Sequence, residues 1–193
     1  MIRQMIFDID GVLIRPWRFA SVLEHEFGLT TDITDPFFSG PFVRCLLGQA
    51  DLMEELPPFL EAWRWPHSLA EFVDRWFVAD SVLNTELLSF VATMRKGGAS
   101  CYVASTQEKH RAAYLETKLE FDRQFDGCFF SCRLGCKKPD VAFFEQVTSQ
   151  LGVDPSEIMF LDDQWENVEA ARRIGWQAEP YSWGVNPFVE TDA

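Results

Sequence analysis

The sequence predicts an α/β fold in which a doubly wound, mostly parallel sheet carries a small all-helical insertion. Two observations favour this class. Short apolar runs alternate with helical patterns over much of the 193-residue chain, as expected for strands joined by helical crossovers. Residues 16–83 interrupt the alternation, because they contain helix-like patterns and many aromatic residues but no clear strand.

Five apolar segments are expected to form the strands. The first, residues 5–7, runs into the turn-forming residues 8–11, which is typical of a buried strand that opens into a loop at its carboxyl end. The other four lie at 100–104, 127–130, 158–161 and 176–178.

Four helices are expected between and after these strands. Residues 86–96 place five apolar side chains on one face before two glycines, a common helix stop. The others cover 109–119, 141–151 and 168–174, and glycines follow the last two.

The predicted elements divide the chain into a core of residues 1–15 and 84–193 and a helical domain of residues 16–83. The helical part leaves the core directly after the first strand. We therefore expect it to lie over the carboxyl end of the sheet, where open α/β sheets bind their ligands.

The composition restricts the classes of partner. A formal net charge of −13 and a pI near 4.6 disfavour nucleic acid and anionic membrane surfaces, which require many cationic side chains. No stretch approaches the ~20 apolar residues that span a bilayer, and the N-terminal residues do not resemble a signal peptide. We therefore expect a cytoplasmic protein.

The five cysteines are expected to be reduced thiols, because their number is odd and their spacing fits no disulfide framework. Cys128, Cys132 and Cys136 recur every fourth residue, which would suit a metal site on one helix. A fourth ligand is missing, and the segment is predicted to be a strand followed by a glycine-containing loop. A cysteine metal site is therefore disfavoured.

Polar residues stand at the ends of several predicted strands, and in a parallel sheet these ends converge on one crevice. Any one of them alone is more simply explained as a helix cap or loop residue. Together they supply what phosphoryl transfer requires: a nucleophile, an acid or base, ligands for a cation, and donors to phosphate oxygens. The set consists of Asp8, Asp10, Ser105, Thr106, Lys138, Asp162 and Asp163.

Four segments also resemble, in order, the motifs of the haloacid dehalogenase-like (HAD) hydrolase superfamily. They are FDIDGVL at 7–13, VAST at 103–106, KKPD at 137–140 and FLDDQWEN at 160–167. The resemblance covers residues 1–15 and 84–176, and the block between them resembles the small helical cap of that family. It implies a Rossmann-like core.

The resemblance implies that Asp8 is the nucleophile that forms an aspartyl-phosphate. Asp10 would protonate the leaving oxygen and then activate water. This mechanism needs one carboxyl group that is ionised and a neighbour that retains a proton. An unperturbed carboxyl has a pKa near 4, so the environment of the second group has to keep it able to donate a proton. The resemblance also implies a Mg²⁺ ion held by Asp8, Asp10 and Asp163, with Asp162 and Asn167 behind these ligands. Magnesium suits a site made of oxygen atoms.

By the same resemblance, Lys138 binds the nucleophile and the phosphoryl group. We assign this role to Lys138 and not to Lys137, because Pro139 follows it as in the family motif. Ser105 occupies the position of the hydroxyl that donates to phosphate. The sequence departs from the family at Thr106, where Asn is common, so that either hydroxyl can make the contact.

The aromatic residues of the insertion, among them Trp17, Trp63, Trp65 and Trp76, are expected mainly to pack its interior. One or two of them could instead line a pocket for the leaving group. Three polar residues, Arg15, His25 and Arg44, could join such a wall, and so could Trp165 beside the expected metal ligand.

The function predicted from these residues is a magnesium-dependent phosphatase that acts on a small phosphorylated metabolite. Alternatives are a dehalogenase, a phosphomutase or a phosphonatase of the same superfamily, and a non-catalytic, phosphate-responsive binding module. Asp10 argues against dehalogenation, which needs neither a proton donor nor a metal. The substrate and the oligomeric state are not predicted.

Overall fold

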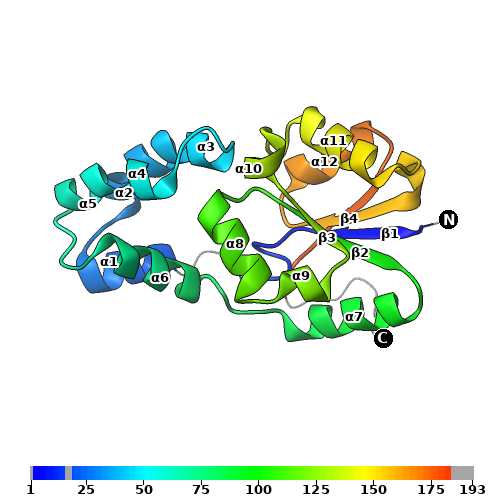
Figure 1. Cartoon of the computed structure of the whole chain (residues 1–193), viewed down its shortest axis with the longest axis horizontal. Coiled ribbons are helices and arrows are strands. Elements are labelled where there is room, and N and C mark those ends of the chain that lie inside the picture. The colour runs from blue at the N-terminus through cyan, green and yellow to red at the C-terminus, as the bar shows by residue number, and fades with distance from the viewer. Residues whose placement is uncertain (1, 16–18, 184–193) are drawn as a thin grey trace.

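The computed structural model describes residues 2–15 and 19–183 and contains a five-stranded parallel sheet (Figure 1). The strand order is β3-β2-β1-β4-β5, so the chain winds outward from β1 in both directions. The predicted doubly wound α/β fold is confirmed. The strands are β1 (Gln4–Phe7), β2 (Ser100–Ser105), β3 (Gly127–Phe130), β4 (Ile158–Asp162) and β5 (Gln177–Pro180), close to the five predicted segments.

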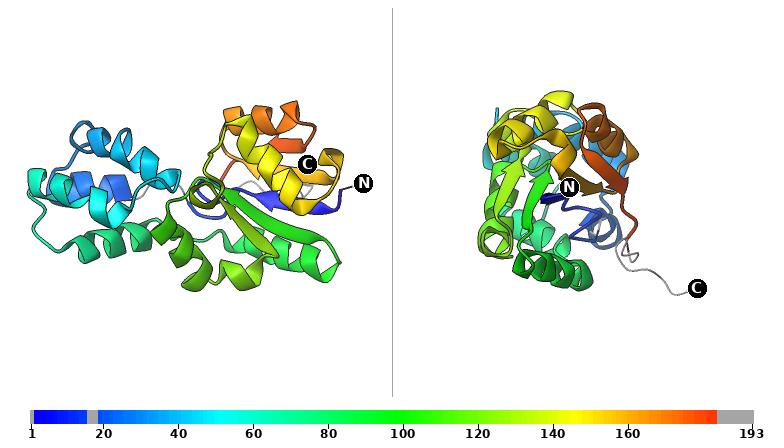
Figure 2. Two further views of the ribbon diagram at one scale, coloured as in Figure 1. Left: turned by 45° about the horizontal axis from the view of Figure 1, so that its top comes forward. Right: turned by 90° about the vertical axis from the view of Figure 1, so that its right-hand side faces the viewer.

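Helices cover both faces of this sheet. Side chains alternate along each strand, so the apolar strands present apolar side chains on both faces. In β1, Met5 and Phe7 pack on one face into a cluster with residues of α7 (Thr85–Lys96), α8 (Lys109–Thr117) and α9 (Phe121–Gln124). Ile6 packs on the other face with α11 (Val141–Leu151) and α12 (Trp165–Arg173). Figure 2 shows the sheet between these two layers.

Some helix boundaries differ from the predictions. Helix α12 begins at Trp165, three residues before the predicted 168; the start was missed because Glu166 and Asn167 are polar and Trp165 is exposed, so the first turn shows no apolar periodicity. The short helices α9, α10 (Ser131–Leu134) and the 3₁₀ turn η1 (Pro155–Glu157) were not predicted, since three or four residues are too few to show a helical pattern.

The inserted block is helical over its described residues. It forms α1 (Phe19–Phe27), α2 (Thr31–Phe38), α3 (Pro41–Leu46), α4 (Leu52–Glu55), α5 (Pro57–Ala62) and α6 (Leu69–Ala79), which we call the helical segment. These helices lie to one side of the sheet (Figure 1) and enclose their own aromatic cluster, which includes Phe37, Trp63 and Phe72. The predicted packing role of these aromatic residues is therefore confirmed, although Trp17 lies outside the described residues.

The helical segment leaves and rejoins the core through two chain connections that run side by side. Ile14 pairs with Leu83 in a single β-bridge. The Arg15 N–H donates to the Val82 carbonyl at 2.9 Å, and the Asn84 N–H donates to the Leu13 carbonyl at 2.8 Å. The start and end of the insertion are thus fixed at one point beside the end of β1.

A second contact joins α3 and α4 to the core. The Asp51 carboxylate, which caps α4, binds Lys109 Nζ and lies 2.6 Å from His110 Nε2 at the start of α8. The Ser131 hydroxyl donates to the Leu46 carbonyl at 2.7 Å. Gly48 has φ +69°, and a Cβ there would lie 2.1 Å from the Cys132 carbonyl oxygen, so glycine permits this close approach.

The cysteines do not share a helix face. Cys128 lies on β3, Cys132 on α10 and Cys136 in the loop that follows, and all five cysteines are unpaired. Among the residues that the structure describes, no helix has the length and apolar character needed to cross a membrane.

Candidate active site

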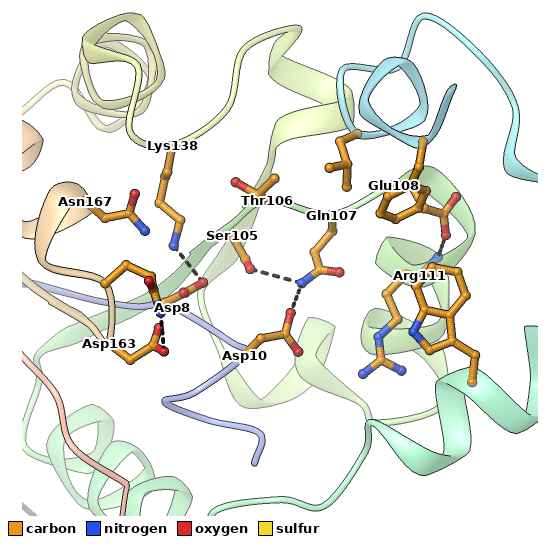
Figure 3. Close-up of a pocket in the computed structure, with 14 residues that line it drawn as sticks. Asp8, Asp10, Ser105, Thr106, Gln107, Glu108, Arg111, Lys138, Asp163 and Asn167 are labelled. Carbon is orange, nitrogen blue, oxygen red and sulfur yellow. Dashed lines mark hydrogen bonds and ion pairs between the residues drawn. The ribbon is translucent and has the colours of Figure 1, made fainter. Parts of the chain in front are cut away.

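A cavity of about 290 Å³ lies where the carboxyl end of the sheet meets the helical segment. Figure 3 shows that residues from separate loops of the core point into it. The predicted residues that line it are Asp8, Asp10, Ser105, Thr106, Lys138, Asp163 and Asn167. Asp162 is fully buried and contacts two of these residues, Lys138 and Asn167, from outside the lining.

Asp8 directly follows β1, and its N–H donates to the Leu161 carbonyl of β4 at 2.9 Å. Its side chain is almost completely buried, with Oδ1 at 2.7 Å from Lys138 Nζ. Burial raises the pKa of Asp8 to about 8, although the charge of Lys138 opposes this shift. The carboxylate therefore depends on nearby positive charge to remain ionised.

Lys138 is fixed between two carboxylates. Its Nζ lies 2.7 Å from Asp8 and 2.5 Å from Asp162 Oδ2. Burial lowers the pKa of Lys138, but Asp162 and Asp8 together raise it above its usual value, so the amine is charged. The other Asp162 oxygen accepts from the Gln164 N–H at 2.8 Å and from Asn167 Nδ2 at 2.9 Å, which fixes this carboxylate in turn.

Asp163 lies against Gly11 of the first motif. Gly11 has φ +88°, and a Cβ there would stand 2.3 Å from the Asp163 Cγ. Any side chain at position 11 would therefore displace the carboxylate, which explains the glycine in this turn. Burial also raises the pKa of Asp163.

The three carboxylates Asp8, Asp162 and Asp163 offer oxygen atoms that all lie within 4.8 Å of one another. Both Asp162 oxygens already accept hydrogen bonds, so the donor set for a cation centres on Asp8 and Asp163. These hard oxygen ligands fit Mg²⁺. A divalent cation there would also offset the cost of burying the carboxylates in ionised form.

Gln107 connects Asp10 with Ser105. Its Nε2 donates to Asp10 Oδ2 at 2.6 Å and to Ser105 Oγ at 3.1 Å, as the dashed lines of Figure 3 show. Because Ser105 accepts from Gln107, its own hydroxyl hydrogen points to a different partner. Burial raises the pKa of Asp10, so the carboxyl retains a proton to higher pH than a solvated one.

The half of the cavity away from Asp8 is mainly apolar. Phe42 and Leu46 come from α3, and Trp76 comes from α6. Two charged residues lie beside them: Glu108, which directly precedes α8, and Arg111, from its first turn.

Comparison of the sequence with known protein families agrees with these motifs and this fold. The sequence matches the family described as haloacid dehalogenase-like hydrolase over residues 2–175. The chain belongs to this family. The HAD-like hydrolase is 26% identical to bifunctional epoxide hydrolase 2 of Rattus norvegicus over 196 residues, which covers 90% of this chain but 35% of the rat protein. It thus spans about a third of that relative's length.

Two further likenesses concern a phosphatase and a solved structure. A 51-residue stretch is 45% identical to the sesquiterpene phosphatase astK of Aspergillus oryzae, covering 26% of each chain. A HAD family enzyme from Bacteroides thetaiotaomicron, in complex with magnesium and inorganic phosphate, superposes with a TM-score of 0.82 at 21% identity, covering 97% of this chain and 98% of that one. The L-2-haloacid dehalogenase of Xanthobacter autotrophicus superposes with a TM-score of 0.67 at 19% identity, covering 92% and 76%.

The other side chains considered as pocket walls of the HAD-like hydrolase are mostly elsewhere. Trp76 lines the cavity, whereas Arg44 binds Glu55 at 2.8 Å and His25 lies 3.0 Å from the Ser21 carbonyl. Trp165 is 50% exposed, lies 5.3 Å from the Arg172 guanidinium and is absent from the described lining. Arg15 is absent from it as well.

Sequence reasoning gave no role to six residues that line the cavity, one of which, Gln164, stands inside the fourth motif next to Asp163. Gln107 was within reach, because it lies in the loop after β2, two positions beyond Ser105. The other four, Phe42, Leu46, Glu108 and Arg111, carried no local signal. Phe42 and Leu46 enter the cavity only because α3 docks on the core.

Proposed function

We propose that this HAD-like hydrolase is a magnesium-dependent phosphatase that hydrolyses a phosphate monoester of a small metabolite through an aspartyl-phosphate on Asp8. The observation that carries the proposal is the second carboxyl group, Asp10, which is half-buried, lines the same cavity and is held by Gln107. Support comes from the phosphatase relative and from the similar fold that was solved with magnesium and phosphate.

In the first step, an Asp8 carboxylate oxygen attacks phosphorus while the bond from phosphorus to the leaving oxygen breaks. Asp10 donates its proton to that oxygen, so an alcohol departs. Its raised pKa suits this role, because the group must hold a proton at neutral pH. Lys138 and the Ser105 hydroxyl bind the non-bridging phosphoryl oxygens.

In the second step, water attacks the phosphorus of the aspartyl-phosphate, and the bond between phosphorus and the Asp8 oxygen breaks. Asp10, now ionised, accepts the proton of the water. Inorganic phosphate leaves and Asp8 is regenerated. One residue thus serves first as acid and then as base, and Gln107 keeps it in place by its 2.6 Å hydrogen bond.

Asp8, Asp163 and the main-chain carbonyl of Asp10 would hold the Mg²⁺ ion. When bound, the ion supplies positive charge that offsets the phosphate and the clustered carboxylates. Asp162 supports this set from behind by binding Lys138, and Asn167, which itself lines the cavity, donates to Asp162.

The helical segment is proposed to act as a cap domain of residues 16–83 over a core of 1–15 and 84–193. Its paired connections at Ile14 and Leu83 support this division, and so does its separate aromatic interior. Five unpaired cysteines support a cytoplasmic setting.

Dehalogenation remains the nearest rival, because a dehalogenase shares the fold. At 19% identity this likeness carries the fold alone. Departure of a halide requires no proton, so Asp10 would have no role in that reaction. Phosphomutase and phosphonatase chemistry would use the same core residues, and no described feature of the cavity favours either.

The test is steady-state turnover of 4-nitrophenyl phosphate by purified protein with and without Mg²⁺, beside a parallel assay for halide release from 2-chloropropionate. We expect multiple turnovers with Mg²⁺, loss of activity with EDTA and no halide release. Asp163→Asn should raise the Mg²⁺ concentration needed for half-maximal activity. Halide release, or no phosphate release from a broad panel of esters with Mg²⁺, would contradict the proposal.

A further inference from the structure

We infer that the cavity selects phosphate esters whose leaving group is neutral and apolar, such as a phenol or a short-chain alcohol. It discriminates against substrates that carry a second anionic group. The inference rests on the proposed function, because it takes the phosphoryl group to bind between Asp8, Lys138 and Ser105. The leaving group then extends toward the end of the cavity that the helical segment contributes.

The side chains at that end form a continuous apolar wall. Phe42 and Trp76 have ring centroids 5.4 Å apart, and Leu46 follows Phe42 by one helical turn of α3. The indole nitrogen of Trp76 donates to Asp80 Oδ2 at 3.1 Å. The one polar atom of this side chain is therefore already bonded, and the ring offers the ligand an apolar surface.

The polar side chains near this wall are already bonded within the protein. Glu108 is 1% exposed, and its two oxygens accept from the main-chain N–H groups of His110 and Arg111, which caps α8. Arg111 Nη1 donates to the Phe77 carbonyl at 2.8 Å and to Ser81 Oγ at 3.2 Å.

The second Nη atom of Arg111 is bonded as well. This Nη2 donates to the Asp80 carbonyl, and the Cζ of Arg111 lies 5.3 Å from the ring centroids of Phe77 and Tyr114. Arg111 therefore holds the end of α6 against α8. Lys138, the other cation of the described lining, lies between Asp8 and Asp162.

A second anionic group on the substrate would meet an unfavourable environment. It would lose water at an apolar wall beside the buried carboxyl group of Glu108, and the Nη groups of Arg111 there already donate to protein oxygens. A neutral ring or chain would instead bury apolar surface against the wall. A cavity of about 290 Å³ has room for a phosphoryl group with a ring or a short chain.

The test compares phenyl phosphate with 4-carboxyphenyl phosphate at saturating Mg²⁺. The two esters differ by one carboxylate, and the substituted phenolate is the better leaving group, so leaving-group chemistry opposes the expected order. We expect kcat/KM to be at least about tenfold higher for phenyl phosphate. In the alkyl series from ethyl to butyl phosphate, kcat/KM should rise roughly two- to fourfold per methylene.

Two variants of α3 locate the effect. Leu46→Lys adds a cation to the wall and should reduce or reverse the preference for phenyl phosphate. Val43→Lys is the matched control, because Val43 is a half-buried residue of the same helix outside the described lining, and it should keep the wild-type ratio. The wild-type ratio tests the inference even if neither variant folds.

The outcomes separate the inference from the proposed function. Equal values of kcat/KM, or a preference for the carboxylated ester in the wild type, would overturn the inference while leaving the phosphatase intact. A failure to release phosphate from any of the esters with Mg²⁺ would overturn the proposed function and the inference with it.

Discussion

The two ends of the cavity are built by opposite means. At the core end, buried charges hold one another, as Lys138 does between Asp8 and Asp162. At the other end, aromatic side chains of the helical segment form the wall, and the charged residues are bonded to main-chain atoms. The difference suggests a division of labour in which the core end reacts with phosphate and the helical end recognises what is attached to it.

The core end is also electrostatically unbalanced. Burial raises the pKa of Asp8, Asp10 and Asp163, and the nearby positive charges, Lys138 at Asp8 and Arg111 at Asp10, offset this shift only in part. Such a site favours a bound cation and a retained proton, and the proposed mechanism uses both. At the helical end burial also raises the pKa of Glu108 and lowers that of Arg111, but main-chain N–H groups bind the first and main-chain carbonyls bind the second.

The largest effect is expected from breaking the charge cluster. Lys138→Met should lower kcat/KM by about a hundredfold or more and the free energy of unfolding by about 3 kcal/mol, since two buried carboxylates lose their shared cation. Lys137→Met is the matched control, because the neighbouring lysine does not line the cavity. Phosphate release and urea unfolding measure the two quantities. Similar results for both variants would contradict the assignment.

The pH dependence of stability sharpens the same comparison. The pKa of Asp8 is raised to about 8 in the folded protein, so the folded state binds more protons than the unfolded state between about pH 4 and pH 8. The metal-free protein should therefore lose stability as pH rises through this window, by at most about 1.4 kcal/mol per pH unit. Thermal unfolding at pH 5 and pH 8 measures this loss.

Mg²⁺ provides the control for that measurement. It should stabilise the protein more at pH 8 than at pH 5, because binding requires ionised carboxylates. In Asp8→Asn both effects should shrink. A metal-free stability that rises from pH 5 to pH 8 would mean that Asp8 does not have the raised pKa.

A smaller effect is expected where the two ends meet, at Gln107. Gln107→Leu removes the donor to Asp10 and Ser105, and kcat should fall roughly tenfold with little change in KM, since the two groups lose their orientation while the leaving-group wall is intact. Gln146→Leu is a control on an exposed glutamine of α11. A change in KM alone would instead indicate a binding role.

The smallest effect concerns the contact between the helical segment and the core. Hydrogen bonds from Lys109, and then His110, lower the pKa of Asp51 against burial, so the ionised group stabilises the fold above about pH 4 and less as pH falls further. Asp51→Asn keeps the α4 cap but removes the charge, and should cost about 0.5–1 kcal/mol at pH 7.

Chemical unfolding at pH 7 and pH 3 measures this contribution. The difference between Asp51→Asn and wild type should narrow at pH 3. Asp74→Asn, on an exposed residue of α6, should match the wild type at both values. If Asp51→Asn lowered the free energy of unfolding equally at pH 7 and pH 3, the charge of Asp51 would not be the source of the stabilisation.

The same contrast explains what the sequence could predict. The core end was predictable because strand ends converge in a parallel sheet, so Asp8, Ser105 and Asp163 could be grouped from local patterns alone. The choice of Lys138 over Lys137 came from the adjacent proline. Most of the wall was not predictable, because Phe42 and Leu46 differ in no local way from aromatic and aliphatic residues that only pack the helical segment. Their position depends on how α3 docks on α10.

The central claim is that Asp8 carries the phosphoryl group, and the Asp10→Asn variant tests it most directly. With 4-nitrophenyl phosphate the leaving group departs without an acid, so the first step proceeds while hydrolysis lacks its base. Rapid acid quench in the presence of Mg²⁺, followed by proteolysis and mass spectrometry, locates the covalent phosphate. We expect it on the peptide that contains Asp8, at close to one per chain. A phosphoryl group on any other residue would contradict the claim, and so would release of 4-nitrophenol without a covalent intermediate.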